Sequence, residues 1–391
     1  MQNKKVVLAY SGGLDTSVCI PWLAERGYEV IAYMADVGQG IDTVAARRRA
    51  IGAGASKLMV DDLKKDFAEH YILPSLRANA TYERDYLLAT ALSRPLIARR
   101  LVEVAKKERA ECAAHGCTGK GNDQVRFEVT IRMLAPELKI IAPLREWDLT
   151  SREAEIEYAR EHNIEIDVTS RSPYSIDMNL WGVSIECGVL EDPNVEPPRD
   201  AYQITTDPAA SPDEPLYLSV YFEKGVPKKL NDSPMNPLDI IRELNKTGGA
   251  YGIGRADLIE DRLVGIKSRE IYEAPAATIL IAAHRALEAL VLDRELLHFK
   301  EPLSQKYGYL IYTGLWETPL RRSLDRFFEE TQRNVTGNVR MKLYKGTAVA
   351  VGRSSHFALY KKELATYTEE DAFDRNAAEG FIKIWSMPYG G

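Results

Sequence analysis

Short apolar segments alternate with longer, partly polar segments through the first part of the chain. Residues 6–10 and 30–34 are rich in β-branched and aromatic side chains, and a glycine-containing turn and a helical stretch lie between them. This pattern predicts a strand, a helix and a second strand parallel to the first. It continues with expected helices at 42–52, 84–109 and 123–134 and expected strands at 57–60, 112–115 and 139–142. Such alternation indicates a mostly parallel sheet covered on both faces, so we predict an α/β domain over residues 1–167.

The pattern changes in the second half of the chain. Six prolines fall between residues 192 and 215, so neither a helix nor a central strand can persist there. Apolar segments at 217–222 and 226–230 surround Glu223-Lys224-Gly225 and predict a β-hairpin. Further helices are expected at 238–245, 274–292 and 320–331, and further strands at 335–344 and 347–352. We therefore predict an α+β domain over residues 168–362.

The last segment, residues 363–391, is expected to form a C-terminal helix. Thr368 begins a sequence typical of a helix N-terminus, and Phe373, Ala377, Phe381 and Ile384 then fall on one helical face. Such an apolar stripe needs a partner surface, which lies either on the same subunit or on a neighbouring one.

Composition and charge narrow the class of protein. Lys and Arg number 51 against 57 Asp and Glu, a formal charge of −6, so we expect no nucleic acid partner. Four cysteines without a CxxC pair favour a reducing compartment and offer no zinc site. No segment approaches the roughly 20 apolar residues of a membrane span. We therefore expect a cytoplasmic protein that does not bind a membrane.

One sequence between the first expected strand and helix carries chemistry. It is Ala9-Tyr10-Ser11-Gly12-Gly13-Leu14-Asp15-Thr16-Ser17. The two glycines allow successive N–H groups to converge on one anion, the hydroxyls add donors, and the helix adds the positive end of its dipole. Such a loop holds phosphate. It lacks the Lys-Ser/Thr pair of a Walker A loop and the GxGxxG pattern of a dinucleotide site.

A second glycine-containing loop, Thr118-Gly119-Lys120-Gly121-Asn122-Asp123, also follows a strand and precedes a helix. Because the carboxyl ends of parallel strands meet at one sheet edge, we expect the two loops to be neighbours. Lys120 and Arg126 supply positive charge for a carboxylate, and Asp123 can accept from an ammonium group. The two loops together indicate a nucleotide site beside an amino acid site.

The first loop resembles the SGGxD(S/T)S pyrophosphate-binding loop of the N-type ATP pyrophosphatases, which have an adenine nucleotide alpha hydrolase-like fold. Further segments make the chain similar to the argininosuccinate synthase family over nearly its whole length. These segments are residues 86–88, 93–95, 115–128, 174–177, 181–186, 190–193, 260–262 and 271–275.

This resemblance implies a ligase of arginine biosynthesis that joins citrulline and aspartate through a citrullyl adenylate and releases AMP and pyrophosphate. ATP would be a co-substrate that carries Mg²⁺ with it, no separate metal site would be needed, and the subunits would form a homotetramer. The implied ATP contacts are Ala9, Tyr10, Ser11, Gly12, Gly13, Leu14, Asp15, Thr16, Ser17, Ala35 and Gly116. The implied aspartate contacts are Thr118, Asn122 and Asp123. The implied citrulline contacts are Tyr86, Asn122, Arg126, Ser175, Ser184, Glu260 and Tyr272. Asp15, Asp123 and Arg126 are the expected catalytic residues.

Three positions depart from the family pattern. Ala91 stands where some members have a serine that touches citrulline, so that contact is either lost or supplied by a neighbour. Met178 and Val183 lie near the citrulline serines, at positions where polar or charged residues are expected in many members.

Two other classes of function stay open on the sequence alone. Another adenylating enzyme, either an amidotransferase or a thiolase, would use the same first loop. Glutamine amidotransferases often begin with a cysteine after Met1, where this chain has Gln2, and a thiolase would need a reactive cysteine such as Cys117. A nonenzymatic ATP sensor would keep the first loop and need no amino acid site.

Overall fold

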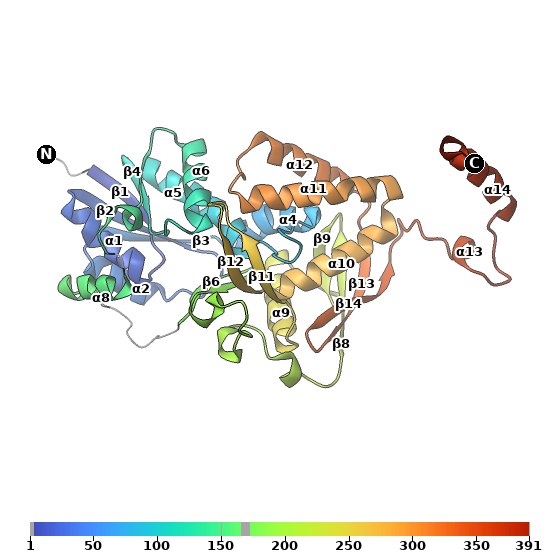
Figure 1. The fold of residues 1–391 in the computed structure, drawn as a ribbon, viewed down its shortest axis with the longest axis horizontal. Helices are drawn as coiled ribbons and strands as arrows, with labels where there is room; N and C mark the ends of the chain where they lie inside the picture. Colours follow the sequence, from blue (N-terminus) through green and yellow to red (C-terminus); the bar gives the residue numbers. More distant parts are fainter. Residues whose placement is uncertain (1–3, 150, 166–172, 391) are drawn as a thin grey trace.

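A computed structural model describes residues 4–149, 151–165 and 173–390. The predicted boundary between residues 167 and 168 lies outside these ranges and stays a prediction. The described residues form three sheets with their helices, and the chain continues into an arm that extends away from them (Figure 1).

The first sheet has five parallel strands in the order β3-β2-β1-β4-β5. They are β1 (Lys4–Ala9), β2 (Tyr28–Asp36), β3 (Lys57–Asp62), β4 (Cys112–His115) and β5 (Lys139–Ile141). Val6 and Leu8 face an apolar layer shared with helices α1 (Leu14–Glu25), α2 (Thr43–Gly52) and α8 (Arg152–Glu161). Val7 faces the opposite layer, shared with α5 (Ala89–Glu108) and α6 (Asn122–Leu134). The predicted parallel α/β fold is confirmed.

Strand β1 marks the point at which the strand order reverses, because β2 and β4 lie on its two sides. Ala9 at the end of β1 pairs with Tyr33 in β2 and with His115 in β4. The loops that follow these strands therefore start side by side. In open parallel sheets, ligands bind at such a reversal, outside the carboxyl ends of the strands.

The second sheet is antiparallel, in the order β10-β9-β8-β13-β14. Its strands are β8 (Leu216–Glu223), β9 (Val226–Leu230), β10 (Ser233–Pro234), β13 (Gly337–Tyr344) and β14 (Thr347–Ser354). β8 and β9 form the predicted hairpin, in which Lys224 and Gly225 have φ values of 49° and 72°. Helices α9 (Pro237–Ala250) and α10 (Pro275–Val291) pack against this sheet. Residues 192–215, all described, contain short 3₁₀ turns and no strand, as their prolines predict.

The sequence pattern does not predict the third sheet, which is antiparallel in the order β11-β12-β7-β6 and packs against α5. Its strands are β6 (Ser175–Asn179), β7 (Gly182–Glu186), β11 (Arg255–Asp261) and β12 (Lys267–Glu273). The pattern also misses α3 (Lys64–Phe67), the π-helical turn Ala68–Ile72, α4 (Leu73–Ala78), α7 (Pro143–Glu146) and α11 (Arg294–Tyr312). It does predict α12 (Pro319–Thr331).

Two predicted helices begin later than expected. α5 starts at Ala89 rather than at residue 84, because Arg84 and Leu88 take positive φ values of 78° and 68° that no right-handed helix contains. The last helix, α14 (Arg375–Ser386), is capped by the Asp374 carboxylate and not by Thr368.

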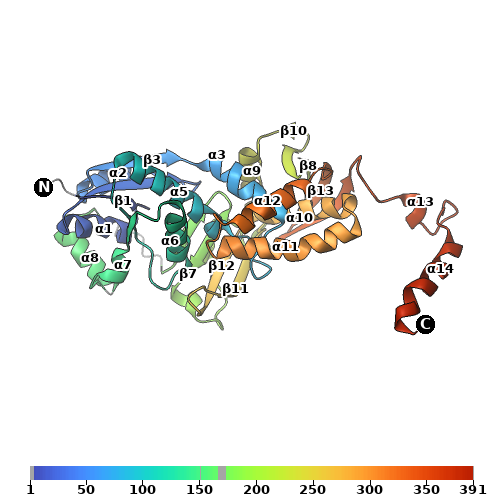
Figure 2. The same ribbon diagram turned by 90° about the horizontal axis from the view of Figure 1, so that it is seen from above.

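The C-terminal arm, residues 361–390, contains α13 (Lys362–Ala365) and α14 and stands apart from the rest of the chain in both ribbon views (Figures 1 and 2). No residue of α14 is buried, and Phe381 and Ile384 are 61% and 70% exposed. The structure therefore contradicts docking of this helix on its own subunit. None of the helices within the described ranges is long and apolar enough to cross a bilayer.

Candidate active site

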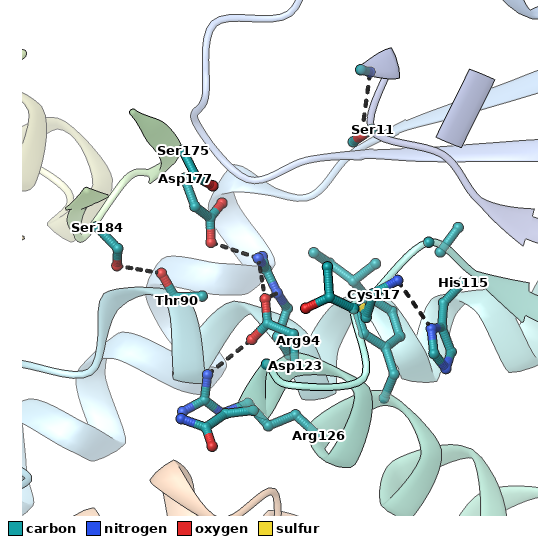
Figure 3. A pocket seen from close by; sticks show the side chains of 18 of the residues that line it. Ser11, Thr90, Arg94, His115, Cys117, Asp123, Arg126, Ser175, Asp177 and Ser184 are labelled. Carbon is teal, nitrogen blue, oxygen red and sulfur yellow. Dashed lines mark hydrogen bonds and ion pairs between the residues drawn. The ribbon is translucent and has the colours of Figure 1, made fainter. Parts of the chain in front are cut away.

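A cavity of about 710 Å³ opens at the carboxyl ends of β1, β2 and β4. The loops after these strands, together with α5 and α6, form one side, and the third sheet forms the other (Figure 3). Both glycine-containing loops line this single cavity, as the position of their strands leads us to expect.

Most of the expected site residues line the cavity. They are Ala9, Tyr10, Ser11, Gly13, Asp15, Thr16, Ala35, Tyr86, Gly116, Thr118, Asn122, Asp123, Arg126, Ser175, Ser184, Glu260 and Tyr272. Gly12, Leu14 and Ser17 do not. Leu14 packs on the apolar layer of α1 and α2. The Ser17 hydroxyl donates to the Gly13 carbonyl at 2.8 Å.

The first loop is shaped by its own side chains. Ser11 Oγ lies 3.0 Å from Thr16 Oγ1 and accepts from the Gly13 N–H at 3.3 Å. Gly12 has a φ of +84°, which residues with a Cβ rarely adopt. Gly13 is the N-cap of α1 and has no side chain to occupy the first N–H groups of the helix. Those groups are therefore available to an anion.

Residues 9–17 contain no basic side chain, and Arg49 of α2 supplies one from outside the loop. Its guanidinium donates to the carbonyl of Gly12. This contact holds the Gly12 carbonyl toward α2 and adds positive charge beside the loop.

The loops after β1 and β4 touch at Gly116. A Cβ at this position would lie 2.8 Å from Thr16 Cγ2, which is closer than real Cβ contacts, so a side chain fits only if Thr16 moves. His115 fixes the turn that follows, because its Nδ1 accepts from the Cys117 N–H at 3.2 Å and its Nε2 lies 3.3 Å from Glu128 Oε1.

Asn122 and Arg126, at the start of α6, form hydrogen bonds with residues in the second half of the chain. Asn122 Nδ2 donates to Tyr312 Oη at 2.8 Å, and its Oδ1 accepts from the Leu263 N–H at 2.9 Å. Arg126 Nε donates to the Tyr312 carbonyl at 2.9 Å. The two halves of the chain therefore meet at the expected amino acid loop.

Asp123 lies between two guanidinium groups (Figure 3). It accepts from Arg94 Nε at 2.8 Å and from Arg126 Nη1 at 2.9 Å. Arg94 Nη2 also donates to Asp177 at 2.5 Å, so one guanidinium joins two carboxylates. Burial favours the neutral carboxyl, but Arg94 and Arg126 outweigh it and lower the pKa of Asp123. Burial raises the pKa of Asp177.

Glu260 is buried and accepts a phenol on each oxygen, from Tyr272 at 2.7 Å and from Tyr312 at 2.8 Å. Tyr86 stacks on Tyr272 with ring centres 4.1 Å apart. Burial raises the pKa of both the Tyr86 and the Tyr272 phenols, which therefore stay neutral. A buried carboxylate held by neutral donors is suited to an ammonium group.

Of the three positions that depart from the family pattern, Met178 lines the cavity, and Ala91 and Val183 do not. Ala91 is fully buried and does not line the cavity, whereas its neighbour Thr90 does and places its Oγ1 2.7 Å from Ser184 Oγ. Thr90 is therefore the neighbour that can supply a hydroxyl. Met178 lines the cavity, and Val183 is buried within the third sheet.

The cavity also contains charged residues that our sequence reasoning misses. Arg262 forms an ion pair with Glu186, and its Nη2 lies 2.5 Å from Glu270 Oε1. Burial, with Glu186 and Glu260 nearby, raises the pKa of Glu270 to about 8. One signal could have found part of this set: Arg94, Asp177, Glu186 and Arg262 all lie inside the segments that carry the family resemblance.

Cys117 lines the cavity, but burial and the charge of Asp123 raise the pKa of its thiol. The thiolate is therefore disfavoured, which argues against the thiolase alternative. Within the part of the chain that the structure describes, no three His, Cys, Asp or Glu side chains gather in a way that could hold a metal ion.

Comparison with known proteins covers almost the whole chain. The arginosuccinate synthase N-terminal HUP domain matches residues 5–165, and the arginosuccinate synthase C-terminal domain matches residues 174–390. An argininosuccinate synthase of Pelodictyon phaeoclathratiforme is 55% identical over 99% of this chain and 97% of its own length. One of Carboxydothermus hydrogenoformans is 53% identical over 98% of this chain and 96% of its own. A solved 4-thiouridine synthetase–RNA complex with bound ATP aligns with 41% of each chain, at a TM-score of 0.31 and 19% identity.

Proposed function

Because this chain belongs to the argininosuccinate synthase family, which joins citrulline and aspartate in arginine biosynthesis, we propose that it does so in two steps within this cavity. One observation carries the proposal. The phosphate-type loop after β1 and the amino acid loop after β4 line the same cavity, opposite the polar residues of the third sheet.

In the proposed first step, the ureido oxygen of citrulline attacks the α-phosphorus of ATP. The bond from the α-phosphorus to the bridging oxygen breaks, and pyrophosphate leaves with the electron pair. The loop after β1 is proposed to hold this leaving group. The uncapped N–H groups at the start of α1 and the hydroxyls of Ser11 and Thr16 support this role. Ala35 and Gly116 are proposed to flank the nucleotide.

We propose that Mg²⁺ enters on the phosphates of ATP and keeps water as part of its ligand set. Asp15, which lines the cavity in the first loop, is the loop's carboxylate and is compatible with such an ion. The ion would neutralise charge on the leaving pyrophosphate.

In the proposed second step, the amine of aspartate attacks the ureido carbon of the citrullyl adenylate. The bond from this carbon to the AMP oxygen breaks, AMP leaves with the electron pair, and the amine gives up a proton. Thr118, Asn122 and Asp123 are proposed to hold aspartate. No protein nucleophile is required, so catalysis rests on alignment and on stabilisation of charge.

Citrulline is proposed to lie against the third sheet. Glu260 with its phenol donors suits the ammonium group, and Arg126 supplies a cation for a carboxylate. Tyr86, Tyr272, Ser175 and Ser184 are proposed to complete this part of the site.

We also propose that the enzyme is a cytoplasmic homotetramer in which the C-terminal arm contacts other subunits. The exposed apolar side chains of α14 support such a contact, since large apolar groups on an isolated helix need a partner surface.

The decisive experiment supplies ATP and citrulline with oxygen-18 in the ureido group. Pyrophosphate release should require citrulline, and the label should appear in AMP once aspartate is added. Release driven by glutamine or by tRNA would contradict the proposal in favour of another adenylating enzyme. Binding of ATP without any release would favour the sensor alternative.

A further inference from the structure

Arg94 lines the cavity and lies between Asp177 and Asp123, although arginine on a helix usually points to solvent (Figure 3). Its side chain is only 15% exposed, and its neighbour Ser93 on α5 is fully buried. Removing a guanidinium from water is costly unless it is paired, so its partners indicate why it is there.

The guanidinium of Arg94 is fixed by three side chains from three elements. Nε and Nη2 lie 2.8 and 2.7 Å from Asp123 Oδ2, at the start of α6. Nη2 donates to Asp177 of β6 at 2.5 Å, and Nη1 donates to Ser93 Oγ at 3.2 Å. The planar fork therefore holds Asp123 in one orientation and is itself held by the third sheet.

We propose that Arg94 is a positioning residue for the addition of aspartate: anchored by Asp177, it sets the direction in which the Asp123 carboxylate meets the incoming amine. This proposal rests on the function proposed above for the cavity. It assigns Arg94 no contact with the nucleotide and no part in the release of pyrophosphate.

The charges around Asp123 support this role. The titratable groups that face it are Arg94, Arg126, Asp177, Cys117 and Tyr86. Burial would raise the pKa of Asp123, and Arg94 and Arg126 together reverse that effect. Removing the charge of Arg94 leaves Asp177 unbalanced beside Asp123. The pKa of Asp123 should then rise, and its carboxylate should take up a proton at higher pH than in the unaltered enzyme.

The test compares Arg94→Gln, which removes the charge, with Arg94→Lys, which keeps the charge but cannot offer the same fork. Arg99→Gln is the matched control, because Arg99 lies on the same helix and pairs with Glu317 outside the cavity. Exchange of labelled pyrophosphate into ATP, with citrulline and without aspartate, isolates the first step. Steady-state kinetics with varied aspartate, from pH 4 to 9, report the second step.

We expect exchange to stay within about twofold in both Arg94 variants, while kcat/KM for aspartate falls at least about tenfold, the effect of losing a hydrogen bond to a charged group. The acid limb of that kcat/KM profile should move to higher pH in Arg94→Gln and move less in Arg94→Lys. Arg99→Gln should match the unaltered enzyme in both assays. If Arg94→Gln does not fold, the test uses Arg94→Lys, for which the KM for aspartate should rise.

Equal loss of exchange and of aspartate use would overturn the proposal, as would an acid limb that stays in place when the charge is removed. If the unaltered enzyme shows no citrulline-dependent exchange, the proposed function itself is wrong and the role of Arg94 falls with it. The unaltered enzyme thus separates the two failures.

Discussion

The protonation state of a charged residue in the cavity depends on side chains that belong to other strands. Glu270 on β12 is 6% exposed and lies near Glu186 and Glu260, and the Arg262 guanidinium contacts the carboxyl groups of Glu186 and Glu270. The pKa of Glu270 is raised to about 8 by burial and by the two nearby carboxylates, so this carboxyl keeps its proton at neutral pH.

Glu270→Gln should therefore weaken the pH dependence of stability. In the unfolded chain the carboxyl loses its proton near pH 4.5, whereas in the folded chain it keeps the proton until about pH 8. Between these values the folded state binds more protons, so stability falls as the pH rises. Thermal melts at pH 5 and pH 8.5 should show a smaller decline for Glu270→Gln than for the unaltered protein. Glu301→Gln, on the exposed side of α11, is the control, and an equal decline in all three proteins would refute the assignment.

Between elements, the loops after β1 and β4 approach each other closely at Gly116. Gly116 leaves no room for a Cβ because of the methyl group of Thr16, and the Thr16 hydroxyl also takes part in shaping the first loop. Helices in the second half of the chain are joined differently, by buried polar groups. His284 and Glu288 of α10 contact Asn79 at the end of α4, Lys300 of α11 and Gln332 after α12.

Gly116→Ala should raise the KM for ATP several-fold, because the new Cβ pushes the first loop away from the second. Thr16→Ser removes the opposing methyl and keeps the hydroxyl, so the double variant should recover most of the affinity. Initial rates at varied ATP measure both effects, with Thr16→Ser alone as the control. Failure of the second change to restore binding would show that the contact is not the cause.

Lys300→Met should destabilise the protein by about 3–5 kcal/mol, since it leaves the Glu288 charge buried without its cation. Urea unfolding monitored by circular dichroism measures this change. Lys306→Met, at an exposed position of the same helix, should stay within about 0.5 kcal/mol of the unaltered protein. A similar small effect at Lys300 would mean that the buried pair contributes little.

The parallel sheet could be predicted from the sequence because β1 and β2 are buried on both faces and read as continuous apolar runs. The third sheet could not. Its strands place polar side chains in the cavity, namely Ser175, Asp177, Ser184, Glu260 and Glu270. These polar residues interrupt the alternation of apolar and polar positions by which a strand is identified in a sequence.

The same reason limits what the sequence tells about the site. The two loops could be found because their glycines, hydroxyls and charges are contiguous in the chain. Arg94 could not be given a partner, because Asp177 is 83 residues away and only the packing of α5 against β6 brings the two together. The start of α5 cannot be placed from the sequence, because nothing in its composition indicates the left-handed backbone of Leu88.

At the scale of the whole molecule, the candidate active-site cavity and the C-terminal arm are separate features. Every residue that lines the cavity precedes residue 273, and the arm begins at residue 361. The arm exposes large apolar groups, among them Trp385 at 65% and Tyr389 at 84%. Its proposed role concerns assembly and not the chemistry of one subunit.

Ending the chain after Tyr367 should lower the molecular mass of the assembly in light scattering, because it removes the whole apolar face of α14. Citrulline-dependent pyrophosphate exchange per subunit should persist in this variant. Ile384→Asp is a milder change that keeps the chain length and should act in the same direction. An unchanged mass in both variants would contradict a role of the arm in assembly.

The cavity has a consequence for folding kinetics, because its walls come together only when residues far apart in the sequence make contact. Thr90 and Ser184 are 94 positions apart, and Asn122 and Leu263 are 141 apart. Contacts at such separations form late, because a long stretch of chain must be ordered before they stabilise anything. On dilution from urea, the helical signal should return before turnover does. A copy caught in that interval would have most of its secondary structure and no means of joining its two amino acids.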